Sequence, residues 1–283
     1  MSNTYQIKTM GRKDLDIAVE WIAKEGWNPG LNDADAFYET DPDGYFMGFL
    51  GSEPISCISA VSYGWKFGFL GFYITKPEYR GKGYGIQVWN KAIDYLGNQN
   101  IGLDGVVAQQ ENYKKSGFKL AYHSIRYEGK WISKSKYSSA NIVEISKIPF
   151  EQLVKYDSQL FPATRPEFLR LWIKQPKCLA IGFLKNNKLQ GYGMVRKCRT
   201  GFKIGPLFAD NESIAAQLFN NLRKFVDDET PVFLDIPEVN KAAVTLVEKY
   251  QMKPMFETAR MYTKRVPEIE LNKIFGVTTF ELG

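Results

Sequence analysis

A strand, a glycine-rich turn and a helix follow one another between Phe67 and Leu96, and this succession constrains the fold more than any other stretch. The apolar, aromatic-rich run Phe67–Thr75 predicts a buried strand. The turn that follows contains RGKGYG at residues 80–85, and apolar side chains at helical spacing come next. In such a turn, backbone N–H groups and the positive end of a helix dipole point to one place. The stretch therefore predicts a phosphate-binding site.

The turn differs from two well-known phosphate motifs. The sequence contains no G-x-x-x-x-G-K-[ST] pattern, and Ile86 stands where a dinucleotide-binding fingerprint has its third glycine. Glycines suit a loop whose amides all face one anion, because side chains would obstruct that arrangement. Spacing alone leaves a second interpretation open, in which residues 80–85 form an exposed surface turn rich in glycine and lysine.

A second motif downstream makes the pattern more specific. The segment Arg80–Gly85 resembles the acetyl-CoA pyrophosphate loop of the GCN5-related N-acetyltransferase (GNAT) superfamily, Gln/Arg-x-x-Gly-x-Gly/Ala. The segment Tyr113–Phe118 resembles the Tyr-x-x-x-Gly-Phe pattern that often follows the fifth strand of that family. Val106 stands where the family usually has an asparagine. Over the whole chain, the resemblance is to the two-domain acetyltransferases of the YitH type.

The resemblance implies acetyl-CoA as the cofactor, with its pantetheine arm paired to the strand before the turn. Tyr113 would be the general acid that protonates the leaving thiolate, although a core aromatic on a short helix is the alternative. The cofactor-binding residues that the resemblance implies are Phe72, Tyr73, Ile74, Arg80, Gly81, Lys82, Gly83, Tyr84, Gly85, Asn112 and Lys115.

Hydrophobic patterns predict an α/β (α+β) fold with a mixed sheet and helices on both sides, in the element order that the resemblance also implies. Predicted strands of the first part are Tyr5–Met10, Tyr45–Leu50, Pro54–Tyr63, Phe67–Thr75, Gly105–Ala108 and closing strands within Phe118–Tyr127. Its predicted helices are Lys13–Glu25, a short one through Phe37 and Tyr38, the helix after the glycine-rich turn, and Asn112–Ser116.

The same element order recurs after residue 140, which predicts a tandem duplication. In the second copy, Pro206–Asn211 stands in place of the glycine-rich turn and Val247 in place of the tyrosine. We therefore expect three parts: residues 1–130 as the acetyl-CoA-binding catalytic domain, residues 131–140 as a linker, and residues 141–283 as a degenerate GNAT-like domain that shapes the acceptor pocket. The last predicted strand is Ala259–Lys264.

Direct acetyl transfer needs a group that takes a proton from the amine, because an alkyl amine with a pKa near ~10 is mostly protonated at neutral pH. The chain has one histidine, His123, which leaves a carboxylate acting through water as the expected base. The candidate bases are Glu25, Asp33 and Glu111, each also explained as a surface or capping residue. Trp27 and Tyr63 are candidates for the acceptor pocket or for the core. Backbone N–H groups near Phe72 or Tyr73 are the expected oxyanion donors. Second-copy residues that could face the same cavity are Arg165, Asp235, Asn240 and Arg260.

Composition narrows the function classes. With 283 residues, a net charge of +6 and intermixed signs, the chain favours a solvated surface over nucleic-acid binding. Three cysteines at unrelated spacings predict neither a disulfide framework nor a metal site. The N-terminus lacks an apolar signal core and no apolar run approaches membrane-spanning length, so we expect a cytoplasmic protein. We expect a monomer or a homodimer.

The leading function is an N-acetyltransferase that acts on a small-molecule primary amine. The alternatives are a non-catalytic acyl-CoA-binding sensor and an acetyltransferase that acts on a protein or an RNA-associated acceptor.

Overall fold

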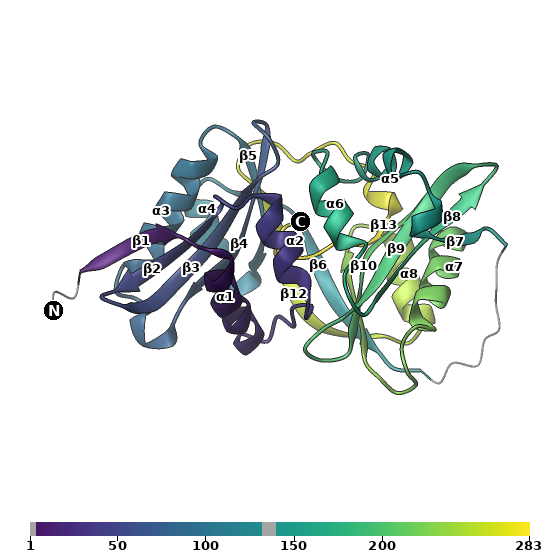
Figure 1. Cartoon of the computed structure of the whole chain (residues 1–283), viewed down its shortest axis with the longest axis horizontal. Coiled ribbons are helices and arrows are strands. Elements are labelled where there is room, and N and C mark those ends of the chain that lie inside the picture. The colour runs from purple at the N-terminus through teal and green to yellow at the C-terminus, as the bar shows by residue number, and fades with distance from the viewer. Residues whose placement is uncertain (1–3, 132–139) are drawn as a thin grey trace.

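The computed structural model describes residues 4–131 and 140–283, here called the first half and the second half. Their strands form one continuous mixed sheet in the order β1-β2-β3-β4-β5-β12-β6-β11-β10-β9-β8-β7, and β13 pairs with β10 (Figure 1). The strands are β1 (Tyr5–Thr9), β2 (Tyr45–Leu50), β3 (Glu53–Ser62), β4 (Phe67–Thr75), β5 (Asn100–Val106), β6 (Lys119–Gly129), β7 (Ile142–Glu144), β8 (Cys178–Lys185), β9 (Lys188–Lys197), β10 (Phe202–Ala209), β11 (Val232–Pro237), β12 (Lys253–Tyr262) and β13 (Ile274–Gly276).

Helices cover both faces of this sheet. They are α1 (Arg12–Lys24), α2 (Asp33–Thr40), α3 (Tyr84–Leu96), α4 (Gln110–Lys115), α5 (Phe150–Asp157), α6 (Pro166–Trp172), α7 (Glu212–Arg223) and α8 (Lys241–Lys249). Helices α1, α2, α5 and α6 share one apolar cluster on one face. On the other face, α3 and α4 pack over the first half and α7 and α8 over the second. The expected mixed α/β fold is confirmed.

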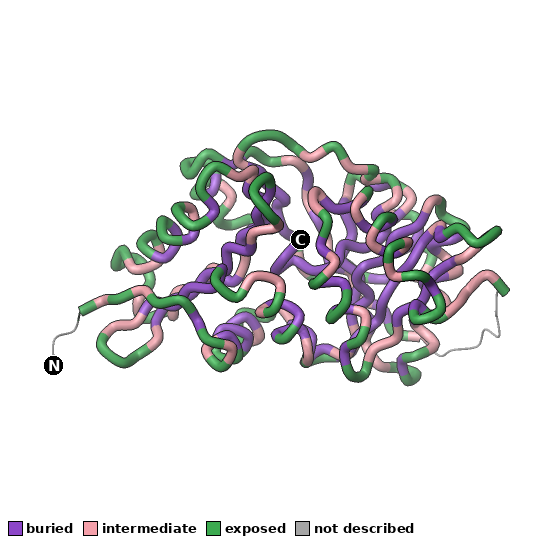
Figure 2. The backbone as a smooth tube through the Cα atoms, turned by 45° about the horizontal axis from the view of Figure 1, so that its top comes forward, coloured by how far each residue is buried: buried purple, intermediate pink, exposed green. Residues whose placement is uncertain are grey.

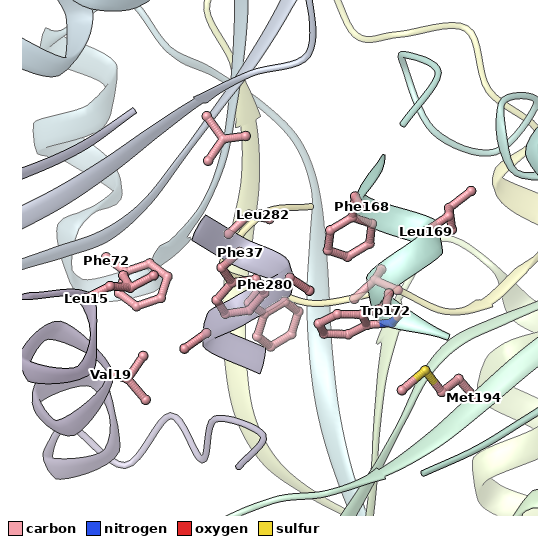
Figure 3. Close-up of a cluster of buried hydrophobic side chains, with 14 of the residues drawn as sticks. Leu15, Val19, Phe37, Phe72, Phe168, Leu169, Trp172, Met194, Phe280 and Leu282 are labelled. Carbon is pink, nitrogen blue, oxygen red and sulfur yellow. The ribbon is translucent and has the colours of Figure 1, made fainter. Parts of the chain in front are cut away.

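The cluster under α1, α2, α5 and α6 joins the two halves into one core. Phe37 of α2 stacks on Trp172 of α6 with ring centroids 5.8 Å apart, and Phe168 of α6 also stacks on Trp172, at 4.9 Å. Phe280 lies beside these rings between the two halves (Figure 3). Large aromatic side chains bury the most apolar area per residue, so this stack stabilises the contact between α2 and α6.

The two halves also exchange strands. β12 of the second half lies between β5 and β6 of the first half, with Thr258 opposite both Val106 and Ser124. On its other edge, β6 pairs with β11 of the second half. The proposed division into residues 1–130 and 141–283 stays a prediction, and residues 132–139 of the expected linker lie outside the described residues. The sheet itself crosses this division without interruption. The first half therefore has a strand of the second half in its own sheet.

Two predicted strands are placed differently in the structure. The fifth strand is Asn100–Val106, whereas half of the predicted strand Gly105–Ala108 falls on a 3₁₀ turn at Val107–Gln109. Two glycines and the buried Asp104 interrupt the apolar pattern of β5, so the pattern does not predict the start of this strand. The last long strand begins at Lys253, six residues before the prediction.

Three buried ion pairs connect the halves. They join Asp33 to Arg196 at 2.9 Å, Asp235 to Arg126 at 2.6 Å, and Asp104 to Arg260 at 2.6 Å. Removing one partner of such a pair typically costs about 3–5 kcal/mol, because the other charge is left buried without compensation. These pairs therefore fix how the halves sit on each other. None of the described helices is long and apolar enough to cross a membrane.

Candidate active site

A cavity opens where β4 and β5 separate. These parallel strands pair from Phe67 and Asn100 as far as Leu70 and Leu103, and their ladder ends there. A cavity of about 540 Å³ occupies the space beyond, lined by β4, β5, α3, α4, β12 and the segment Val277–Gly283. The backbone of β4 after Leu70 thus has one edge free of β5, where an extended ligand can pair as an added strand.

A bulge in β4 marks the point of separation. The register between β3 and β4 shifts between the pairs Ser59–Gly71 and Cys57–Ile74, so β4 holds one extra residue there. Phe72 has a φ of 52°, in the left-handed region, and its carbonyl accepts a hydrogen bond from the Cys57 thiol at 3.0 Å. Bulges redirect backbone groups beside active sites. Phe72 and Tyr73 both line the cavity, so their N–H groups are candidate oxyanion donors.

The glycine-rich turn lies at the mouth of the cavity. Gly81 and Gly83 have φ values of 75° and 82°, which a side chain would strain, and Gly83 is the N-cap of the 13-residue helix α3. Arg80 donates to the carbonyl of Thr75 at 2.8 Å and pairs with Glu25 at 2.5 Å. The first-turn amides of α3 and the Arg80 guanidinium together suit a pyrophosphate.

Tyr113 lines the cavity. Its ring stacks on Trp89 of α3 with centroids 5.6 Å apart, and only 8% of the residue is exposed. Burial raises the pKa of Tyr113, with a smaller contribution from Tyr73. The phenol therefore stays protonated at neutral pH, which is the state that a proton donor needs.

The structure brings most of the expected residues together. Those that line the cavity are Glu25, Trp27, Phe72, Tyr73, Ile74, Arg80, Gly81, Gly83, Gly85 and Tyr113. Four expected cofactor residues lie outside the lining: Lys82, Tyr84, Asn112 and Lys115. Lys82 extends over the Tyr79 ring at 5.5 Å, and the Asn112 amide donates to Gln109 at 2.7 Å.

Asp33 takes a different position from the one expected. Its side chain is 1% exposed, pairs with Arg196 and accepts the backbone N–H of Gly30 at 2.9 Å. This carboxylate is a structural partner at the junction of the halves and lies outside the cavity lining. Glu111 pairs with Lys114 on the surface of α4. Tyr63 donates its hydroxyl to the carbonyl of Leu282 at 2.9 Å.

The second half contributes to the cavity through other residues than those expected. Arg165 pairs with Asp157, Asp235 with Arg126, and Asn240 caps α8. Arg260 lies behind the lining, where it holds Asp104 in a bidentate pair. The second-half residues that do line the cavity are Phe256, Thr258, Phe280 and Glu281. No local pattern signals them, because they reach the cavity only through the exchange of β12 and the return of the last segment.

Among the described residues, no group of three or more His, Cys, Asp or Glu side chains could hold a metal ion. Both halves resemble a known family of enzymes. The model of the Acetyltransferase (GNAT) family matches residues 15–118, and the model of the Acetyltransferase (GNAT) domain matches residues 153–276. The chain is a tandem GNAT acyltransferase.

Two curated relatives of this tandem GNAT protein align over most of its length. Holothin acyltransferase of Pseudoalteromonas sp. (strain SANK 73390) is 28% identical over 281 residues, covering 99% of this chain and 95% of that protein. The uncharacterized N-acetyltransferase YitH of Bacillus subtilis (strain 168) is 25% identical over 245 residues, covering 85% and 86%. The expected resemblance to two-domain GNAT enzymes is thereby confirmed.

Solved structures agree on the tandem GNAT fold. An acetyltransferase structure from Pyrococcus horikoshii superposes with a TM-score of 0.83 at 23% identity, covering 99% of this chain and 96% of that one. A tandem GNAT protein from the clavulanic acid biosynthesis pathway superposes with a TM-score of 0.66 at 11% identity, covering 92% and 98%. GNAT domains generally use acetyl-CoA or another acyl-CoA. The turn at Arg80–Gly85, the free edge of β4 and the cavity volume fit such a donor.

Proposed function

We propose that this GNAT protein transfers an acetyl group from acetyl-CoA to the primary amine of a small molecule. The observation that carries the proposal is one cavity lined by the glycine-rich turn before α3, by the bulged strand β4 with its free edge, and by the buried phenol of Tyr113 on α4. An acyl-CoA supplies a thioester carbonyl for attack by the amine.

The chain's own residues have separable roles in this proposal. Arg80 and the amides of Gly81 to Gly85 bind the pyrophosphate, and the N–H groups near Phe72 stabilise negative charge on the carbonyl oxygen. The Tyr113 hydroxyl donates its proton at the sulfur as the carbon–sulfur bond breaks. Trp89 holds the Tyr113 ring in place by stacking. Lys82, Tyr84, Asn112 and Lys115 contribute charge or contacts at the rim of the same site.

The acceptor end of the cavity is aromatic on several sides, because Trp27, Phe256 and Phe280 line it. Walls of this kind suit a compact organic molecule. The relative named for acylation of holothin supports a small-molecule acceptor for this chain too. We further propose that residues 1–130 carry the transfer chemistry, that residues 131–140 link the copies, and that residues 141–283 shape the acceptor pocket.

Release of free thiol tests this proposal. The full-length protein is incubated with acetyl-CoA and a panel of primary alkyl and aryl amines, and coenzyme A thiol is titrated over time. We expect thiol release that depends on at least one amine. Binding of coenzyme A without thiol release for any amine would instead indicate an acyl-CoA sensor, and acetylation of added protein or RNA-associated acceptors alone would indicate a macromolecular acceptor.

A further inference from the structure

The segment Val277–Gly283 returns to the first half and brings a carboxylate to the cavity. Phe280 and Glu281 line the cavity, and the segment is buried at the centre of the molecule (Figure 2). The carbonyl oxygen of Glu281 lies only 2.1 Å from where a Cβ on Gly71 would stand, so glycine is required there for the close approach. Gly71 is the first residue of β4 after its separation from β5. Glu281 therefore sits beside the bulge at Phe72.

Glu281 differs from the other buried carboxylates near the centre. Asp33, Asp104, Asp157 and Asp235 each pair with an arginine at 2.6–2.9 Å. Glu281 is 3% exposed, and one of its oxygens, Oε2, accepts a hydrogen bond from the Thr279 hydroxyl. No described residue forms an ion pair with Glu281 or donates a hydrogen bond to its Oε1. A buried carboxylate costs free energy unless it is paired, so an unpaired one lining a cavity indicates a role in binding or catalysis.

Charged groups on five strands surround this carboxylate. The cations are Arg126 on β6, Arg196 on β9 and Lys203 on β10, and Glu281 acts electrostatically on all three. The anions are Asp104 on β5, which Glu281 also influences, and Asp235 on β11, which neutralises Arg126. Glu281 therefore lies among charges of both signs, and none of these three cations forms an ion pair with it.

We propose that Glu281 is the general base for the acceptor amine and binds the acceptor as its ammonium form. This inference rests on the proposed acyl transfer. Oε1 takes one proton from the ammonium, and the nitrogen lone pair then forms a bond to the thioester carbon. The carbon–sulfur bond breaks, and its electron pair takes the proton of Tyr113. The second proton of the nitrogen returns through solvent to the Tyr113 phenolate, and the proton on Glu281 leaves to solvent, so one proton is released in each turnover.

The positions of the two groups suit this division of work. Tyr113 belongs to the apolar cluster under α3, whereas Phe280, the neighbour of Glu281, belongs to the cluster under α1 and α2 on the opposite face of the sheet. The segment that carries Glu281 and the helix that carries Tyr113 therefore reach the cavity from different packing clusters. Direct transfer needs a proton acceptor at the amine and a proton donor at the leaving thiolate, and two separate walls of the cavity can supply them.

The surroundings of Glu281 also define an acceptor class. Trp27, Phe256 and Phe280 line the same cavity, and Arg126 supports the Phe280 ring from behind at 5.1 Å. An amine carried on a flat, apolar body fits rigid aromatic walls with one carboxylate among them. We expect arylalkyl amines to be better acceptors than amino acids, whose own carboxylate would be repelled by Glu281 and Asp104.

Glu281→Gln tests the assignment in the full-length protein, since it removes the proton acceptor while keeping the shape of the side chain. With the best alkyl amine of the panel, we expect kcat to fall about a hundredfold or more. The dissociation constant for coenzyme A should stay within twofold. The loss should shrink for an arylamine, because an amine that is neutral at the assay pH needs no deprotonation before attack. Glu257→Gln is the matched control: Glu257 lies on β12 between two lining residues, pairs with His123 on the outside and should keep wild-type kinetics.

Each outcome separates this inference from the proposed function. If the wild-type protein releases thiol and Glu281→Gln matches it, the base assignment is wrong while the acyltransferase function stands. A rise in KM with kcat unchanged would make Glu281 a binding residue only, and an equal loss for alkyl and aryl amines would contradict proton removal. Weakened coenzyme A binding would mean that the variant disturbs the fold, which also overturns the assignment. If no amine supports thiol release by the wild type, the proposed function fails and the inference fails with it.

Discussion

The same feature of the fold serves opposite purposes in the two halves. In the first half, β4 and β5 separate after Leu70 and Leu103, and the space between them is the cavity. In the second half, β10 and β11 pair only as far as Ile204 and Leu234, and β13 enters the space beyond. β13 pairs with β10 through Leu207 and Phe208, and the N–H of Val277 donates to the backbone carbonyl of Asp235 in β11 at 2.8 Å. In the second half, the gap between β10 and β11 is thus occupied by β13 of the same chain.

This difference explains what became of the second copy. β13 pairs with the backbone groups of β10 that a pantetheine arm would need, so the second half has no free strand edge there. Its sequence also lacks the glycine-rich turn, since residues 206–211 contain no glycine. The loss has a use, because β13 leads directly into the segment that carries Phe280 and Glu281 to the first cavity. We therefore expect one coenzyme A per chain.

Tyr113→Phe should have the largest effect. Removing the hydroxyl leaves the ring on Trp89 but takes away the proton donor, so kcat should fall about a hundredfold or more, with coenzyme A affinity unchanged. Steady-state thiol release measures the change. Tyr250→Phe is the control in the second half, where the corresponding helix α8 ends and Tyr250 contacts Asn220. That variant should keep full turnover, and wild-type turnover by Tyr113→Phe would end the acid assignment.

Gly276→Val tests whether β13 is a structural strand. A Cβ at residue 276 would lie 2.6 Å from Leu234 and 3.2 Å from Leu207, so the larger side chain overpacks the filled space. We expect the free energy of unfolding to fall by about 1–3 kcal/mol in urea titrations. Coenzyme A should still bind at one site per chain by calorimetry. A second binding site in this variant would mean that β13 only covers a functional site in the second half.

Much of this architecture could be predicted from local patterns. The bounds of β2 and β4 match their predictions. The glycine-rich turn and Tyr113 both line the cavity. These features depend on residues close together in the chain: alternation along a strand, glycines in a turn, and apolar spacing along a helix. The prediction of a second copy without a phosphate turn has the same origin, since Pro206–Asn211 has no glycine.

What local patterns missed depends on distant contacts. Asp33 was predicted as a candidate base at the substrate site, yet it pairs with Arg196, which lies 163 residues away in the chain. The burial of Asp104 in β5 also depends on a distant residue, because Arg260 of β12 compensates its charge. The local sequence therefore did not predict it. Glu281 received no role from its sequence, since only the exchange of β12 and the entry of β13 bring the last segment to Gly71.

Gly83→Ala should have a moderate effect that is specific to the first half. Gly83 holds a φ of 82° at the start of α3, and an L-residue in this conformation costs roughly 1–2 kcal/mol, which binding must supply if the turn relaxes. We expect the dissociation constant for coenzyme A to rise about tenfold, equivalent to about 1.4 kcal/mol. Gly97→Ala, at the other end of α3 with a φ of 54°, should lower stability without this loss of affinity. Equal affinities for both variants would contradict a phosphate site at residues 80–85.

Asn211→Ala should have the smallest effect, and only on stability. Asn211 stands where the second copy would have its phosphate turn, and its side-chain oxygen accepts the N–H of Ile214 at 3.1 Å to cap α7. Loss of such a cap typically lowers the free energy of unfolding by about 1 kcal/mol. Because the cap already uses one of the first-turn amides that α3 offers to a ligand, coenzyme A affinity should stay at the wild-type value. A variant with lost affinity and unchanged stability would show that this helix start binds the donor, and the contrast between the two halves would no longer hold.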